Sequence, residues 1–89
     1  MRYQVLIQKK VARRLPKLPR EVQETFRLLI DDLRSKGPVR KEWPNYSKLG
    51  KLTHHCHLSY SWVAVWREDE GDNLILEVNY VGSRENASY

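Results

Sequence analysis

The chain opens with a short stretch in which apolar and polar side chains alternate. Tyr3, Val5 and Ile7 occupy every second position, and the polar residues Arg2, Gln4 and Gln8 fall on the other face; this period of two is typical of a strand with one buried face. We therefore expect a strand over residues 2–8. No apolar run in the chain approaches the roughly 18 residues that span a bilayer, so the pattern predicts a soluble protein without a membrane partner.

Two helices are expected next. Val11, Leu15 and Leu18 follow the spacing of a short amphipathic helix, which prolines at 16 and 19 must end or break. A longer helix starts at Pro19, because proline is favoured in a first turn, and it stops at the Gly-Pro pair 37–38. The two helices should form a hairpin with one apolar face. The stripe of the longer helix consists of Val22, Phe26, Leu29, Ile30 and Leu33.

The second half of the chain reads as a loop followed by three strands. Residues 39–51 are polar, basic and without a clear period, whereas 52–60, 62–68 and 73–81 are strand-like. We expect one α+β domain over residues 1–89: an N-terminal strand, a two-helix hairpin and a three-stranded antiparallel meander. The helices should pack on one face of a four-stranded sheet.

Alternation along the 52–60 run assigns its side chains to two faces. His54 and Cys56 fall on the mostly apolar side that meets the helices, while His55 and His57 fall on the uncovered side. Cys56 should therefore be a buried, unreactive thiol with a raised pKa.

The 73–81 run divides in the same way. Its apolar set, which includes Val78 and Tyr80, should face the helices, and the set containing Glu77 and Val81 should lie opposite. Two histidines and a carboxylate then share the open face. A shift of one residue in register would exchange the faces.

The chain is short, and its positive charge is unevenly distributed along the sequence. With 89 residues, the core is small, so an active site should be an open surface feature. The net charge is +5, with seven Lys or Arg and no acid in residues 1–20 and six against Glu42 in residues 34–51. Such regions suit a polyanion or an acidic partner, or form a solvated basic face. A single cysteine fits the reducing cytoplasm.

The His-His-Cys-His run at 54–57 raises two kinds of chemistry. A structural zinc site needs four ligands, but only His55 and His57 project together and no other Cys or His exists, so we expect no metal and no cofactor. Histidine also serves as general acid or base in RNA cleavage, and arginine clamps phosphate. Arg84, Glu85 and Tyr89 follow the last strand at the edge of this face. Surface polarity alone is the alternative explanation for the paired histidines.

The order of these elements and three segments resemble the toxins of the RelE/ParE superfamily. The segments are Trp-Pro-Asn-Tyr-Ser-Lys-Leu at 43–49, His-Cys-His-Leu at 55–58 followed by Trp62, and Tyr-Val-Gly-Ser-Arg-Glu-Asn-Ala-Ser-Tyr at 80–89. The resemblance spans nearly the whole chain and is strongest to the YafQ-type and HigB-like patterns. It implies the RelE-like microbial RNase fold.

The resemblance also implies a function. Toxins of this superfamily in type II toxin–antitoxin systems are cytoplasmic, metal-independent mRNA endoribonucleases that inhibit translation. They cut mRNA in the ribosomal A site and leave a 2′,3′-cyclic phosphate and a 5′-hydroxyl. The partners that the resemblance implies are a cognate antitoxin, mRNA, and the ribosome with its ribosomal RNA.

Individual roles follow from the same resemblance. His57 matches the histidine that acts in YafQ-like toxins, with His55 assisting. Arg84 stands where the family has an Arg or His after the Gly-Ser/Thr turn and would stabilise the phosphorane. Tyr89 resembles the C-terminal Tyr or Phe that positions the scissile nucleotide.

The resemblance also gives roles to the basic loop, and the sequence departs from the YafQ pattern at one position. Lys48 and Lys51 lie where RelE-like toxins place catalytic or RNA-binding lysines. Ser61 replaces the Asp of the YafQ pattern, so His55 or Glu85 would substitute for that acid/base group. The alternatives are a ParE-like inhibitor of DNA gyrase and a non-catalytic interaction protein of the same fold. The expected RNA-binding residues are Lys48, Lys51, Lys41 and Arg40.

Overall fold

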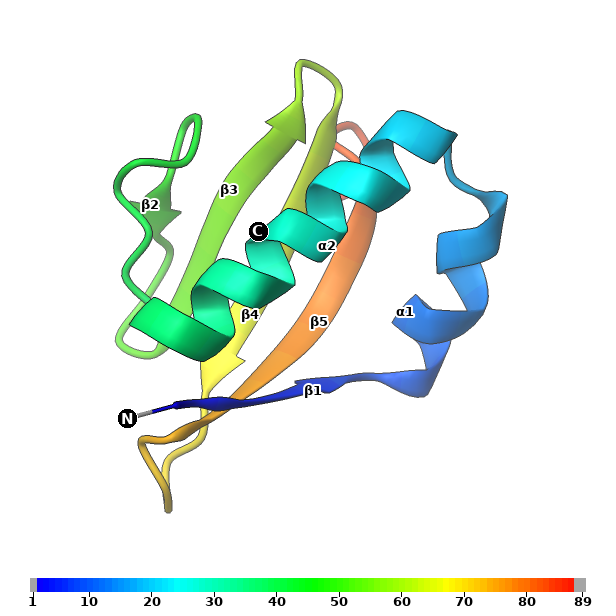
Figure 1. The fold of residues 1–89 in the computed structure, drawn as a ribbon. Helices are drawn as coiled ribbons and strands as arrows, with labels where there is room; N and C mark the ends of the chain where they lie inside the picture. The colour runs from blue at the N-terminus through cyan, green and yellow to red at the C-terminus, as the bar shows by residue number, and fades with distance from the viewer. Residues whose placement is uncertain (1, 88–89) are drawn as a thin grey trace.

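A computed structural model describes residues 2–87 of the chain as an α+β fold in which the helices lie on one side of a mixed sheet (Figure 1). This is the predicted fold class, with a first strand, two helices and a terminal meander. The elements in chain order are β1 (Gln4–Ile7), α1 (Lys9–Arg14), the 3₁₀ turn η1 (Leu15–Lys17), α2 (Arg20–Lys36), β2 (Ser47–Lys48), β3 (Thr53–Ser59), β4 (Trp62–Glu68) and β5 (Ile75–Ser83).

The sheet has five strands in the order β1-β5-β4-β3-β2 rather than the four that were predicted. The extra strand, β2, lies within the predicted loop and pairs with β3 through only Ser47 and Lys48. Two residues cannot produce a readable period. The first strand pairs in parallel with the last, with Gln4 opposite Ile75, while the other pairs are antiparallel.

The two helices end where proline and glycine in the sequence predict that they should. Pro16 lies in η1, which continues directly from α1, because proline cannot donate the backbone hydrogen bond of a longer α-helix. The second helix ends at Gly37, where φ is +92° and a Cβ would approach the Tyr3 ring to 2.7 Å. Both facts favour glycine at position 37.

Within residues 2–87, no helix is both long enough and apolar enough to cross a membrane.

The core lies between α2 and the sheet. The predicted stripe of α2 is buried there together with Cys56, Trp66 and Leu76. Trp66 is fully buried, and its indole N–H donates to the carbonyl of Pro38 over 3.0 Å. This bond satisfies the polar atom of a large core side chain and attaches the segment after α2 to the sheet.

A β-bulge in β5 corrects the predicted faces of that strand. Val65 pairs with Tyr80 but the next residue, Trp66, pairs with Val78, so Asn79 is an extra residue. The bulge reverses the alternation beyond it. Val81 is buried in the core, contrary to the prediction. Tyr80 shares the open face with its partner Val65, also contrary to the prediction.

Candidate functional site

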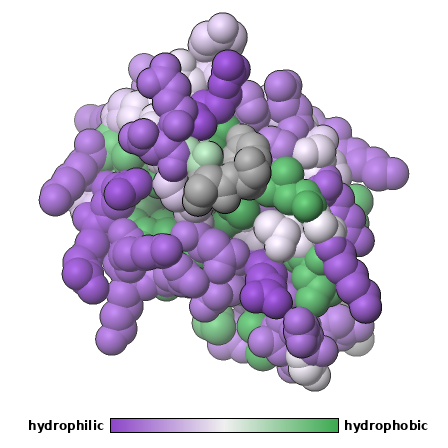
Figure 2. Space-filling view, turned by 180° about the vertical axis from the view of Figure 1, so that it is seen from behind, coloured by the Kyte–Doolittle hydropathy of each residue, from purple (hydrophilic) through white to green (hydrophobic). Residues whose placement is uncertain are grey.

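Two rows of side chains cross the open face of the sheet. The first runs through Ser47, His55, Val65 and Tyr80, which are successive register partners on β2, β3, β4 and β5. Directly paired residues in antiparallel strands point to the same side. Seen from behind α2, this side is rimmed by hydrophilic side chains with hydrophobic surface between them (Figure 2).

The two predicted histidines meet on this face. The rings of His55 and His57 lie edge to face with centroids 6.0 Å apart. His57 is half-buried, whereas His55 is only 8% exposed and its Nδ1 lies 2.9 Å from the Ser47 hydroxyl. Burial lowers the pKa of His55 below its usual 6.5; the Ser47 backbone opposes this shift and His57 adds to it. His55 therefore favours its neutral form.

The second row places Arg84 near His57. His57 pairs with Val63, and Val63 pairs with Gly82. Two residues after Gly82, the Arg84 backbone N–H donates to the Ser61 carbonyl over 2.7 Å. The start of the C-terminal segment is thereby fixed against the β3–β4 turn, at the end of the face that carries His57.

A tyrosine and an arginine that the sequence did not indicate also belong to this face. The Arg14 guanidinium lies 5.9 Å from the centre of the Tyr80 ring. The Tyr80 hydroxyl donates to the Ser83 carbonyl, and a Cβ on Gly82 would lie 2.7 Å from that hydroxyl. Glycine at 82 thus leaves room for the ring. Lys10 and Arg14 line a cavity of about 330 Å³ beside Tyr80, which adds positive charge from α1.

The third histidine of the run serves the opposite face. His54 is fully buried and stacks on Trp66 with ring centroids 5.9 Å apart. Its Nε2 is hydrogen-bonded to the Glu68 carboxylate and its Nδ1 to the Tyr46 hydroxyl; both distances are 2.7 Å. Burial and the Glu68 charge raise the pKa of Tyr46. The Tyr46–His54–Glu68 chain therefore anchors the loop before β2 to the sheet.

The basic residues of the loop separate into exposed and internal groups. Lys41, Lys48 and Lys51 are exposed. Arg40 is buried, and its guanidinium donates to the carbonyls of Gly37 and Lys36 and to Glu42. With its donors engaged inside the protein, Arg40 is placed as a brace for the end of α2, and it does not join the exposed lysines.

The lysines also differ in their relation to the histidines. The register sets Lys48 opposite His54, on the helix side of the β2 edge, while its neighbour Ser47 faces His55. The loop is held along β3 because the His57 N–H donates to Pro44 O and the Leu49 N–H to Thr53 O, both at 2.8 Å. The loop that carries the exposed lysines thus runs along the edge of β3, with Lys48 on the face opposite the histidine pair.

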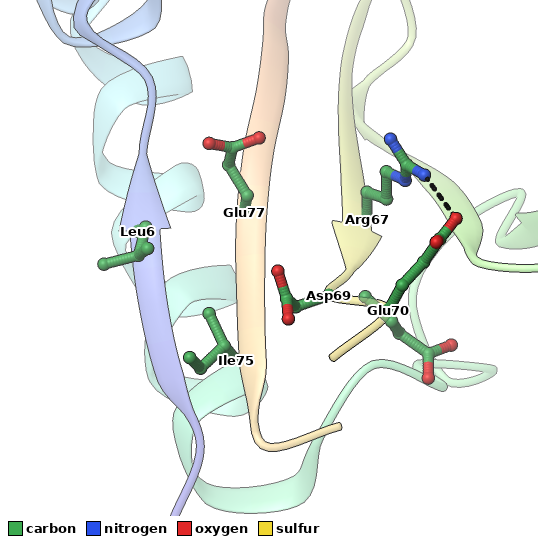
Figure 3. Close-up of a pocket in the computed structure, with 7 residues that line it drawn as sticks. Leu6, Arg67, Asp69, Glu70, Ile75 and Glu77 are labelled. Carbon is green, nitrogen blue, oxygen red and sulfur yellow. Dashed lines mark hydrogen bonds and ion pairs between the residues drawn. The ribbon is translucent and has the colours of Figure 1, made fainter. Parts of the chain in front are cut away.

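The far end of the open face is acidic (Figure 3). Glu77 lies there, and its carboxylate accepts from the side-chain amides of Gln8 and Asn79. It lines a cavity with Leu6, Glu70 and four other residues, in which Arg67 pairs with Glu70. The predicted carboxylate is on the predicted face, but the register sets it opposite Arg67 rather than in either histidine row.

The remaining expectations concern the end of the chain, the thiol and metals. Glu85 is exposed beside Arg84, while Tyr89 lies outside the described residues. Cys56 is fully buried, and burial, aided by the Glu42 charge, raises its pKa to about 12; the prediction of a buried thiol with a raised pKa is confirmed. Within residues 2–87, no three His, Cys, Asp or Glu side chains are grouped so that they could hold a metal ion.

The arrangement of strands and helices is that of the RelE-like toxin fold. The archaeal RelE–RelB complex from Pyrococcus horikoshii OT3 matches with a TM-score of 0.74 and 18% identity, over 98% of this chain and 100% of that one. The YoeB dimer from Staphylococcus aureus matches with 0.71 and 8%, over 91% and 95%. RelBE2 from Mycobacterium tuberculosis matches with 0.58 and 16%, over 94% and 100%.

These matches rest on structure. No protein-family model matches the chain, and no curated protein sequence does. The likeness confirms the fold that the sequence resemblance implies. Activity has to be argued from the residues of the site.

Proposed function

We propose that this protein is the toxin of a type II toxin–antitoxin system and cleaves mRNA on the ribosome without a metal ion. The observation that carries the proposal is the edge-to-face pair of His55 and His57 on the open face, with Arg84 fixed at the end of the same face. Histidine can take or give a proton near neutral pH. Arginine supports the charge that develops on a phosphate.

The reaction divides among these residues. A general base takes the proton of the 2′-hydroxyl, which attacks the adjacent phosphorus. The bond to the 5′-oxygen breaks as a general acid protonates that oxygen, and a 2′,3′-cyclic phosphate and a 5′-hydroxyl result. His57, the more exposed of the pair, acts as general base or acid, and neutral His55 assists it. Arg84 stabilises the phosphorane, and Glu85 stands beside it as a second acid/base group.

Positive charge indicates where the RNA lies. The loop that carries the exposed Lys41, Lys48 and Lys51 runs along the β3 edge of the sheet, and Arg14 beside Tyr80 adds charge at the β5 side. The acidic end around Glu77 repels phosphate. The RNA therefore crosses the histidine end of the sheet, with Tyr89 positioning the scissile nucleotide as the resemblance implies.

The partners follow from this surface and from the comparisons. An open site without an enclosing cavity leaves substrate positioning to the ribosomal A site and its ribosomal RNA. Several of the matched structures are complexes of a toxin with its antitoxin, among them RelE–RelB and RelBE2. A cognate antitoxin is therefore the partner we propose, and the cytoplasm, where ribosomes translate, is the proposed location.

The test combines growth with mapping of mRNA ends. Expression of the wild-type chain should arrest growth and give new 5′ ends within translated codons in primer extension. His57→Gln and Arg84→Ala should each lower cleavage by about 10²- to 10⁴-fold, the usual contribution of such groups, and restore growth. Leu28→Ala is the matched control, since Leu28 is exposed on α2, and it should stay toxic.

Other outcomes identify the alternatives. Toxicity with intact mRNA and altered DNA supercoiling would indicate a ParE-like gyrase inhibitor. No growth effect from the folded wild-type chain would indicate an interaction protein. Full cleavage by both site variants would remove the catalytic assignment.

A further inference from the structure

The β3–β4 turn presents an aromatic ring that the proposed reaction does not use. Tyr60 is 84% exposed, although a Tyr ring carries a large apolar surface that is usually covered. The Arg84 guanidinium lies 5.7 Å from the centre of this ring. The Arg84 guanidinium therefore lies over the Tyr60 ring, and the two form a cation–π pair at the surface.

The surface beside Tyr60 is hollow and held in place by the backbone. A cavity of about 290 Å³ is lined by both halves of this region, the turn and the end of β5. Trp62 pairs with Ser83, and the Arg84 N–H donates to Ser61 O. The walls are thus fixed by two strands. The lining residues are Tyr60, Ser61, Trp62, Ser83, Arg84 and Glu85.

The chemistry of the lining selects one kind of ligand. An aromatic ring and a guanidinium plane are the groups on which unpaired bases stack. The Glu85 carboxylate is an acceptor, so it favours a base edge that carries N–H donors. The positive charge of Arg84 and the negative charge of Glu85 offset each other, so stacking is the main attraction for a ligand at this place.

We propose that Tyr60, with Arg84 and Glu85, forms a subsite for one unpaired nucleobase of the RNA. Tyr60 follows His57 by three residues on the same hairpin, and three residues span at most about 10 Å at roughly 3.3 Å per residue. The base therefore belongs to a nucleotide close to the scissile bond. The subsite rests on the proposed function and specifies the ligand that Arg84 holds next to the reacting phosphate.

The experiment measures binding of short single-stranded RNA. Fluorescence anisotropy with labelled hexanucleotides should give a Kd for Tyr60→Ala that is about 5- to 150-fold weaker than wild type, the range of one stacked base. Tyr60→Phe should bind as wild type does, since it keeps the ring. Leu28→Ala, on α2, should not change the Kd. Circular dichroism confirms that each variant is folded.

An abasic nucleotide separates stacking from other effects. When it replaces the stacked base, wild type and Tyr60→Ala should bind equally, because the ring then has nothing to stack on. Glu85→Gln should change the ranking of oligonucleotides that differ in the base at that position. On ribosomes, Tyr60→Ala should raise KM with little change in kcat.

The outcomes distinguish this subsite from the function on which it rests. Wild-type cleavage with an unchanged Kd and KM in Tyr60→Ala would overturn the subsite and leave the nuclease in place. A wild-type chain that does not cleave would overturn the nuclease. If Tyr60→Ala weakens binding of the cognate antitoxin and leaves RNA binding unchanged, the ring is a protein contact and the subsite is wrong.

Discussion

The two faces of β3 use the same residue type for opposite purposes. On the helix side, His54 is fully buried between Tyr46 and Glu68 and stacks on Trp66. On the open side, the His57 ring is half-buried and lies against His55. These side chains alternate along one short strand, so their different surroundings follow from the pleat of the sheet.

The difference shows how a site is separated from its support. Both ring nitrogens of His54 are engaged by fixed partners, so the ring holds the loop before β2 in place. Ser47 follows that loop as the first residue of β2, and it contacts His55 on the other face. The buried histidine thereby positions a neighbour of the exposed pair while its own ring takes no part in the proposed reaction.

Replacing His54 by alanine should have the largest effect on folding. The change removes a fully buried ring and leaves the Tyr46 hydroxyl and the Glu68 carboxylate without their partner. Together these losses should lower the free energy of unfolding by about 3–5 kcal/mol. His57→Ala should cost no more than about 1 kcal/mol. Urea unfolding at pH 7 checks both, and equal losses would contradict the division between the faces.

Cys56, also on the helix side of β3, should make the protein less stable in alkali. Its pKa of about 12, against 9.0 for a free thiol, means that the unfolded chain ionises first as pH rises. Stability is therefore lost between pH 9 and 12, by about 1 kcal/mol at pH 10. Cys56→Ala should remove this part of the decline. Other groups, including Tyr46, contribute equally to both proteins, so parallel slopes in urea unfolding would refute the prediction.

The smallest expected effect belongs to His55, on the open side. Burial holds its pKa below 6.5, so the unfolded chain binds a proton before the folded chain does. Stability should fall as pH drops below 6.5, and His55→Gln should lessen that slope. The free energy of unfolding measured between pH 7 and pH 5 tests this. An unchanged slope would show that His55 is as readily protonated in the fold as in the unfolded chain.

The faces of β3 could be predicted because alternation continues unbroken from His54 to His57. The same rule failed in β5, where the bulge at Asn79 exchanges Tyr80 and Val81. A bulge leaves no mark in the hydrophobic pattern of a strand that is apolar on both sides of it, since Val78, Tyr80 and Val81 fit either face.

Side-chain positions that depend on contacts between distant parts of the chain could not be predicted from the sequence either. Arg14 reaches Tyr80 from α1 because the helix packs beside β5, and nothing in the local pattern encodes that approach. Arg40 counted as one more positive charge in a basic loop, but the fold surrounds it with the carbonyls that end α2. The charge of a residue can be read from the sequence, whereas its burial depends on tertiary packing.

The parallel pairing of β1 with β5 determines how late in synthesis the sheet can form. Gln4 pairs with Ile75, so a chain that leaves the ribosome N-terminus first has no partner for β1 until β5 has been made. Pairing over such a long sequence separation is slow and comes late in folding. Prematurely terminated chains lack the sheet in its final form, and only full-length copies can display the two histidine rows together with Arg84.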